Sequence, residues 1–160
     1  MKIRNGAVFV ALVSGLSMAA PGQDTEKSVK IEDLPVAVRK TVMEQSKGVK
    51  IRGLSQEVKQ GKTYYEAELT VNGHKKDVLM DTSGAIVEIE EEVALNSLPP
   101  AVRTGIEKQA GHGKILRVET ITKNNAIVAY EAEVESAGKK SEIKVGLDGK
   151  PITGTGQKHY

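Results

Sequence analysis

The motif LPVAVR at Leu34–Arg39 returns as LPPAVR at Leu98–Arg103, 64 residues later along a chain of 160 residues. A second motif keeps almost the same spacing, because YEAEL at residues 65–69 returns as YEAEV at residues 130–134. Self-similarity of this kind indicates repeated structural units. The sequence therefore predicts two tandem copies of one unit, which we place at residues 31–93 and 94–154.

Each copy begins with the pattern of an amphipathic helix. Leu34, Val38 and Val42 are spaced four residues apart, so they share one face of a helix. The second copy repeats this apolar stripe at Leu98, Val102 and Ile106. After each helix, turn signals separate short strands, at Gln60-Gly61, Asn72-Gly73, Asn124-Asn125, Ala137-Gly138 and Asp148-Gly149. We therefore expect an α+β fold in which each copy has one helix and four short antiparallel strands.

The second strand of each copy indicates which way the sheet faces. In the first copy Tyr65, Ala67 and Leu69 alternate with polar residues, as expected when one face packs on the helices and the other meets water. The first strand does not alternate in this way. Ile51 and Leu54 fall on opposite faces unless a bulge intervenes, so the phase of that strand stays open.

The amino-terminal residues 1–22 have the pattern of a secretory signal peptide. Lys2 and Arg4 precede the apolar stretch of residues 7–16, and Ser17-Met18-Ala19 forms a small-x-small cleavage signal. Cleavage after Ala19 or after Gly22 fits this pattern. Residues 23–30 are polar and predict a flexible lead-in, while residues 155–160 form a tail.

Loss of the leader changes the charge of the protein. Removing Lys2 and Arg4 lowers the basic residues from 23 to 21, against 21 acidic ones, so the mature chain is neutral. The basic isoelectric point of the whole chain is therefore a weak argument for nucleic-acid binding. We expect a periplasmic or secreted protein with no membrane anchor after cleavage, and with no nucleic acid as its partner.

The order of motifs resembles the PepSY-like repeat, also described as β-lactamase-inhibitor-like. LPVAVR and LPPAVR, the two YEAE strands and the late Asp148-Gly149 carry the resemblance, which covers nearly all of the mature chain. It implies two units whose strands join into one curved sheet, with helices on one face and the other face open. It also implies a bacterial protein that acts by binding, since related PepSY domains are thought to inhibit or escort peptidases.

The open face is the expected binding surface for another envelope or secreted protein. Tyr64 is the one aromatic residue on its polar side, and its counterpart in the second copy is Ala129. The same charges also fit a structural role, in which cross-strand pairs keep the face soluble. A surface with so few aromatic anchors is not expected to inhibit a lactamase tightly. We expect partner contacts at Tyr64, Glu66, Glu68, Lys75, Glu131, Glu133, Lys140 and Lys144.

Catalysis has no candidate residues in this chain. The absence of cysteine excludes thiol nucleophiles and zinc–thiolate sites, and the three histidines lack metal-ligand spacing. In Asp81-Thr82-Ser83-Gly84 the inserted Ser83 breaks the aspartic-protease spacing, and a turn explains this stretch. We therefore predict a secreted non-enzymatic binding module without cofactor or metal, acting as a protein inhibitor or modulator of the peptidase type. The alternative is a periplasmic small-ligand or cation-binding protein that uses the acidic run Glu88–Glu92.

Overall fold

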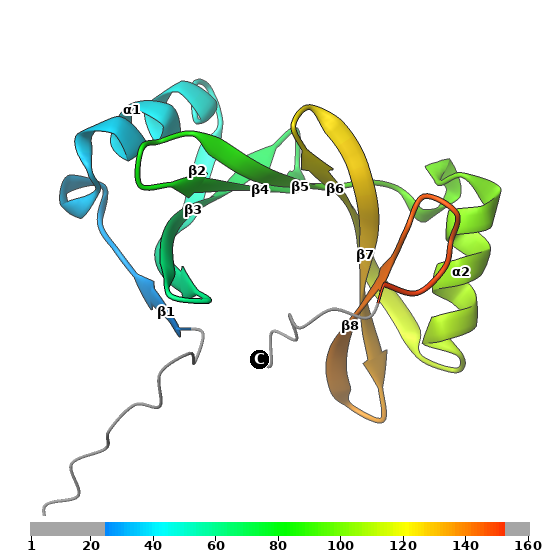
Figure 1. Cartoon of the computed structure of the whole chain (residues 1–160). Coiled ribbons are helices and arrows are strands. Elements are labelled where there is room, and N and C mark those ends of the chain that lie inside the picture. The colour runs from blue at the N-terminus through cyan, green and yellow to red at the C-terminus, as the bar shows by residue number, and fades with distance from the viewer. Residues whose placement is uncertain (1–24, 153–160) are drawn as a thin grey trace, which may run out of the picture.

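The computed structural model describes residues 25–152, and its strands form one antiparallel sheet in the order β1 to β8 (Figure 1). The predicted signal peptide, at residues 1–22, and tail, at residues 155–160, lie outside the described residues. The two α-helices are α1 (Val36–Gln45) and α2 (Pro100–Ala110), each preceded by a short 3-10 turn, at Ile31–Asp33 and Leu95–Ser97. The strands are β1 (Thr25–Ser28), β2 (Lys50–Lys59), β3 (Lys62–Val71), β4 (His74–Asp81), β5 (Ile86–Glu92), β6 (Lys114–Lys123), β7 (Ala126–Ser136) and β8 (Lys139–Val145).

The predicted division into two units of one helix and four strands is wrong. In the described part of the chain, which ends at Ile152, helix α2 is followed by three strands, β6 to β8, and then by a single bridge between Val145 and Pro151. Proline has no N–H to donate to the neighbouring strand, and the next described residue, Ile152, donates its N–H to the Lys144 carbonyl oxygen over 2.9 Å. The sheet has eight strands because β1, which lies in the segment expected to be a flexible lead-in, pairs with β2. The pairing of β5 with β6 joins both halves into one continuous sheet.

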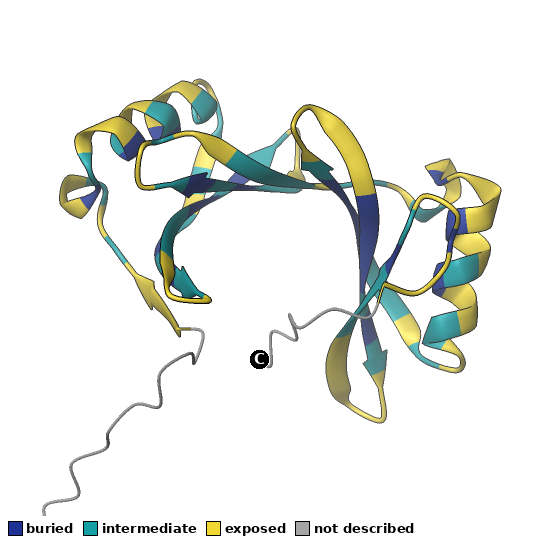
Figure 2. Cartoon of the chain, in the orientation of Figure 1, coloured by how far each residue is buried: buried dark blue, intermediate teal, exposed yellow. Residues whose placement is uncertain are grey.

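Both helices pack against the same face of this sheet. Val38 and Val42 of α1 are fully buried against β3 and β4, in a cluster with Leu69, Val78 and Met80. Val102 and Ile106 of α2 are likewise fully buried, in a cluster with Tyr130 and Val145. Figure 2 shows dark blue, buried bands on both helices among exposed and intermediate positions. The apolar stripes predicted from the sequence are therefore confirmed.

Strand β2, the first strand after α1, contains a bulge at the place where the sequence left the strand phase undecided. The register between β2 and β3 shifts between Ile51 and Gly53, and the register between β6 and β7 shifts between Ile115 and Arg117. A bulge changes which residues face each side of a sheet. The shift allows Ile51 and Leu54 to pack against the same apolar cluster. It also leaves Arg52 free to reach the opposite, polar face.

Each half anchors its helix with a glycine turn. The turn at Gly84 (φ +81°) lies on α1, where the Thr41 hydroxyl donates a hydrogen bond to the Gly84 carbonyl oxygen over 2.7 Å. The turn at Gly149 (φ +76°) lies against α2 so closely that a Cβ atom there would be 2.1 Å from the Ala101 carbonyl oxygen. These contacts fix both helices on the outer side of the curved sheet (Figure 1). Within residues 25–152, neither helix has the length and apolar character needed to cross a bilayer.

Candidate functional site: the concave face of the sheet

The sheet face opposite the two helices is strongly charged, and we call it the concave face. Alternation along the strands places on it every second residue of β3, β4, β5, β7 and β8, together with the end of β2 and the middle of β6. The eight predicted partner-binding residues all lie on this face, in the described part of the chain. They are Tyr64, Glu66, Glu68, Lys75, Glu131, Glu133, Lys140 and Lys144. Their role in binding stays a prediction.

Carboxylates lie directly opposite one another on neighbouring strands of this face. In one row Glu68 of β3 is opposite Asp77 of β4, which is opposite Glu90 of β5. In the next row Glu92 of β5 is opposite Glu119 of β6, which is opposite Glu131 of β7. We call these the two carboxylate rows. Like charges directly opposite each other destabilise a sheet, so this arrangement needs compensating cations.

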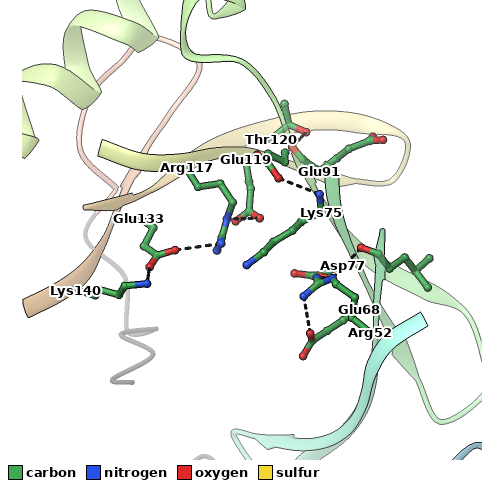
Figure 3. A network of polar contacts seen from close by, with 12 residues as sticks. Arg52, Glu68, Lys75, Asp77, Glu91, Arg117, Glu119, Thr120, Glu133 and Lys140 are labelled. Carbon is green, nitrogen blue, oxygen red and sulfur yellow. Dashed lines mark hydrogen bonds and ion pairs between the residues drawn. The ribbon is translucent and has the colours of Figure 1, made fainter. Parts of the chain in front are cut away.

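Arginine supplies part of this compensation in each half. Arg52 lies 2.9 Å from Glu68 (Nη1–Oε2) and 2.7 Å from Asp77 (Nη2–Oδ1). Arg117 lies 2.9 Å from Glu119 (Nε–Oε1), and its Nη1 lies 3.1 Å from an oxygen of Glu133. Each arginine thus holds two carboxylates, as its forked guanidinium group allows. Figure 3 shows these two groups with the side chain of Lys75 between them.

Lysines hold the outer end of the network. Lys140 Nζ is 2.6 Å from Glu133 Oε1, and Lys144 Nζ is 3.0 Å from Glu131 Oε2. The hydrogen bond from Lys140, together with the charge of Arg117, lowers the pKa of Glu133. Burial lowers the pKa of Lys144, but the charge and hydrogen bond of Glu131 and the charges of Glu90 and Glu88 together outweigh burial, so the pKa lies above its ordinary value. These ion pairs therefore favour the charged forms of Glu133 and Lys144.

Glu119 is a buried carboxylate of the network whose charge is incompletely compensated. It is 5% exposed, and burial raises its pKa above the ordinary value, with the nearby charges of Asp77 and Glu131 adding to the effect. Arg117 opposes this shift, but its contact with Glu119 lacks hydrogen-bond geometry. The ionised form of Glu119 is thus disfavoured in the folded protein. An additional positive charge near the carboxylate rows would favour it.

The acidic run at Glu88–Glu92 contributes to two places on the concave face. Its alternate residues Glu88, Glu90 and Glu92 share this face, while Glu91 points to the other side. Glu88 forms an ion pair with Lys123, with 2.7 Å between Oε2 and Nζ. Glu92 accepts a hydrogen bond from the backbone N–H of Lys75 over 3.0 Å. Oxygens of Glu90, Glu119 and Glu131 lie within 4.8 Å of one another, which is close enough to share a cation.

Tyr64 lies at the other end of the concave face from the lysines of β8. It is half-buried, with Glu57 opposite it on β2 and Asp81 opposite it on β4. Glu57 is only 2% exposed and pairs with Lys59. The ring therefore sits beside buried charge, as expected for a rigid residue within a polar surface.

Several residues of this face escaped the sequence prediction. Arg52 and Arg117 were missed because the bulges reverse the strand phase just where they lie, and Glu119 was missed for the same reason. One signal was present: Arg52 and Arg117 are 65 residues apart, the same distance that separates their partners Glu68 and Glu133. An arginine and a glutamate that both recur after the same number of residues predict an ion pair that is present in both halves.

Comparison with known proteins finds solved structures with a similar fold. No protein-family model matches the chain, and no curated protein matches its sequence. A proposed periplasmic protein from Bacteroides eggerthii is 16% identical with a TM-score of 0.60, over 79% of this chain and 88% of that one. A BLIP-like protein from Bacteroides fragilis is 21% identical with a TM-score of 0.51, over 77% of this chain and 84% of that one. The chain has a BLIP-like fold.

A further match supports the same BLIP-like fold. A DUF2874 family protein from Bacteroides ovatus is 19% identical with a TM-score of 0.55, over 75% of this chain and 85% of that chain. At these identities the likeness concerns the path of the backbone. The residues of the concave face must therefore be interpreted from their own contacts.

Proposed function

We propose that this protein is a periplasmic, non-enzymatic binding protein that uses the concave face to bind another envelope or secreted protein. One observation carries the proposal. The helices cover one face of the sheet, whereas the other face is charged and, among residues 25–152, is covered by neither helix. Its side chains are already held in position by ion pairs, so binding would require little additional ordering.

Two lines support the periplasmic part of the proposal. The leader pattern at residues 1–22 predicts export, and one structure with the same fold is described as a proposed periplasmic protein. The PepSY resemblance adds the kind of partner, a peptidase that is inhibited or escorted. A non-enzymatic role agrees with the sequence, which offers no nucleophile with a positioned base.

The test is capture of a partner from the host periplasm by the mature protein, compared with two matched variants. The first, Glu68→Lys/Glu92→Lys, reverses two charges of the concave face. The second, Glu44→Lys/Glu107→Lys, makes the same charge change at exposed positions of α1 and α2, on the helical side. We expect the concave-face variant to lose the captured protein and the helix variant to keep it.

The same experiment decides against the proposal if the helix variant alone loses the captured protein. That result would place the binding surface on the helical side. Circular dichroism of both variants must show the wild-type fold, because Glu68 pairs with Arg52 and Glu92 accepts a hydrogen bond from the Lys75 N–H. Captured proteins are then assayed for peptidase activity with and without the bound module.

Cation binding is the second candidate, favoured by the close oxygens of Glu90, Glu119 and Glu131. Lys144 and Arg117 already pair with two of these three carboxylates, which weakens the case for a metal ion. A ligand that binds only the native state raises the melting temperature. Titration with calcium chloride or copper sulfate during thermal melting tests this alternative, and no shift with either ion argues against it.

A further inference from the structure

We propose that the concave face receives a basic segment of its protein partner, with Lys or Arg side chains lying along the two carboxylate rows. This inference rests on the proposed function and specifies the chemistry of the partner. It follows from the register of the sheet, from the burial of the carboxylates and from the way the protein itself uses arginine on this face.

The register places more carboxylates together than a structural role requires. Glu92, Glu119 and Glu131 lie side by side on three consecutive strands, with Arg117 beside Glu119 and a lysine at each end of the row. Lys144 is opposite Glu131 at one end, and Lys75 is next to Glu92 at the other. A face whose charges served only solubility would place acidic residues opposite basic ones on neighbouring strands, because like charges directly opposite each other are unfavourable. Together the two carboxylate rows hold six carboxylates, and the cations next to them among the described residues are two arginines and two lysines. The two rows are therefore complementary to added positive charge.

Burial strengthens this complementarity. Glu119 and Glu131 are 5% and 9% exposed, so their interactions are screened by water much less than those of surface charges. Removal of a cation from such a site costs more than removal of one from the rim of an interface. A partner side chain placed here would therefore contribute strongly to the lifetime of the complex.

The internal arginines show how a guanidinium group fits this face. Arg52 bridges Glu68 and Asp77 from neighbouring strands, and Arg117 bridges Glu119 and Glu133. Between these two bridges lies Lys75, whose charge reaches both Glu119 and Glu133. A partner arginine or lysine would make the same kind of contact, with carboxylates on adjacent strands.

The spacing of the rows specifies the form of the segment. Glu90 and Glu92 belong to different rows and are two residues apart on β5, which is about 6.6 Å along a strand. Alternate residues of an extended segment have the same separation. A segment that lies along the strands with basic residues at every second position would thus contact both rows. A single metal ion, with ligands at roughly 2.3–2.6 Å, would satisfy only one place on them.

The experiment uses the full mature chain and a short fluorescein-labelled peptide of alternating Lys and Ser, with an alternating Glu and Ser peptide as control. Fluorescence anisotropy measures binding at about 0.15 M salt, where charges far apart are largely screened. The row variant is Glu92→Gln/Glu119→Gln/Glu131→Gln. The matched variant, Glu32→Gln/Glu44→Gln/Glu107→Gln, removes the same formal charge from exposed positions off the concave face.

We expect saturable binding of the basic peptide and no binding of the acidic one. The row variant should weaken binding by at least about tenfold, and the matched variant by less than about twofold. Absence of saturable binding, or equal weakening by both variants, overturns the inference. Calcium chloride that binds through the same three glutamates and displaces the peptide also overturns it, since the occupant is then a metal ion. Thermal melts establish that every variant is folded.

A second arm separates this inference from the proposed function. A protein captured from the periplasm is cross-linked to the concave face, and the contacting segment is identified by mass spectrometry. A contacting segment with alternating basic residues supports the inference. A segment without Lys or Arg overturns it while the binding function stands, whereas capture that ignores the concave face overturns the function itself.

Discussion

The glycine turn at Gly149 tests how the second helix is held on the sheet. Gly149 is buried and has a φ of +76°, and a Cβ atom there would lie 2.1 Å from the carbonyl oxygen of Ala101 in α2. Gly149→Ala therefore introduces two costs. The left-handed backbone costs an alanine about 1–2 kcal/mol. Displacement of the helix by the added methyl group costs about 1–3 kcal/mol more.

A matched substitution separates these two costs. Gly138 has nearly the same φ, +75°, but a Cβ atom there would meet no atom within 4 Å. Gly138→Ala should therefore lower the free energy of unfolding by the backbone cost alone. The difference between the two variants, about 1–3 kcal/mol, measures the packing of the turn on α2.

Urea denaturation followed by circular dichroism gives both free energies of unfolding, with an unchanged m-value expected for each variant. The first half allows the same comparison, since Gly84 lies against Ala37 of α1 whereas Gly73 is in open space. Equal destabilisation by Gly149→Ala and Gly138→Ala would show that the turn does not pack on the helix. The account of how the helices are fixed would then be wrong.

Three further predictions concern the core and the concave face. Ile106→Ala should lower the free energy of unfolding by about 2–5 kcal/mol, because Ile106 is fully buried against the sheet; a urea transition shifted by less than about 1 kcal/mol would contradict its place in the core. Glu119→Gln should stabilise the protein at pH 7. The folded state raises the pKa of Glu119, so this group favours folding below its unfolded pKa and the contribution is lost as pH rises through the folded pKa. Urea denaturation at several pH values should show the advantage of the variant shrinking with acidification, and an advantage that grows would refute the sign. Tyr64→Ala should weaken partner capture by on the order of 1–3 kcal/mol with little change in melting temperature. Surface plasmon resonance against the captured protein measures this loss, and unchanged binding would remove Tyr64 from the site.

The apolar side of this protein could be predicted from sequence because its signals are local. The stripe at Leu34, Val38 and Val42 needs only the period of a helix, and the alternation from Tyr65 to Leu69 needs only the period of a strand. Both predictions are confirmed by burial. Paired turn residues with positive φ, such as Gln60 and Asn72, also occur where the sequence indicated hairpins.

The number of strands in each half could not be predicted in the same way. Thr25–Ser28 has no buried residue, and it forms a strand because the edge of β2 offers backbone hydrogen bonds. Such pairing leaves little trace in composition. Conversely, the turn glycine Gly84 recurs as Gly149, but Pro151 has no N–H to donate, and in the described residues the pairing after this turn is one bridge at Pro151 and one hydrogen bond from Ile152. Edge pairing therefore broke the symmetry that the repeat predicted.

The concave face was predictable only where strand phase was unambiguous. The partner-binding candidates on β3, β4, β7 and β8 follow from simple alternation, and their placement on one face agrees with the structure. The two arginines that organise them lie at bulges, where alternation fails. The carboxylate rows depend on the register between β5 and β6, which joins residues of different copies and has no local signal.

The two halves of the concave face are related by sequence but differ in chemistry, and the difference bears on how a partner can bind. Tyr64 in the first half corresponds to Ala129 in the second. Arg52 in the first half neutralises Asp77 from β4, whereas Arg117 pairs with Glu119 from its own strand. One half therefore offers an aromatic ring, while the row of Glu92, Glu119 and Glu131 lies at and beyond the junction between the halves. A partner that presents the same groups to both halves would match either the aromatic ring or the carboxylate row, but not both. A single segment with an apolar residue near Tyr64 and basic residues along the rows would use both, so mutations at the two places should weaken the same complex.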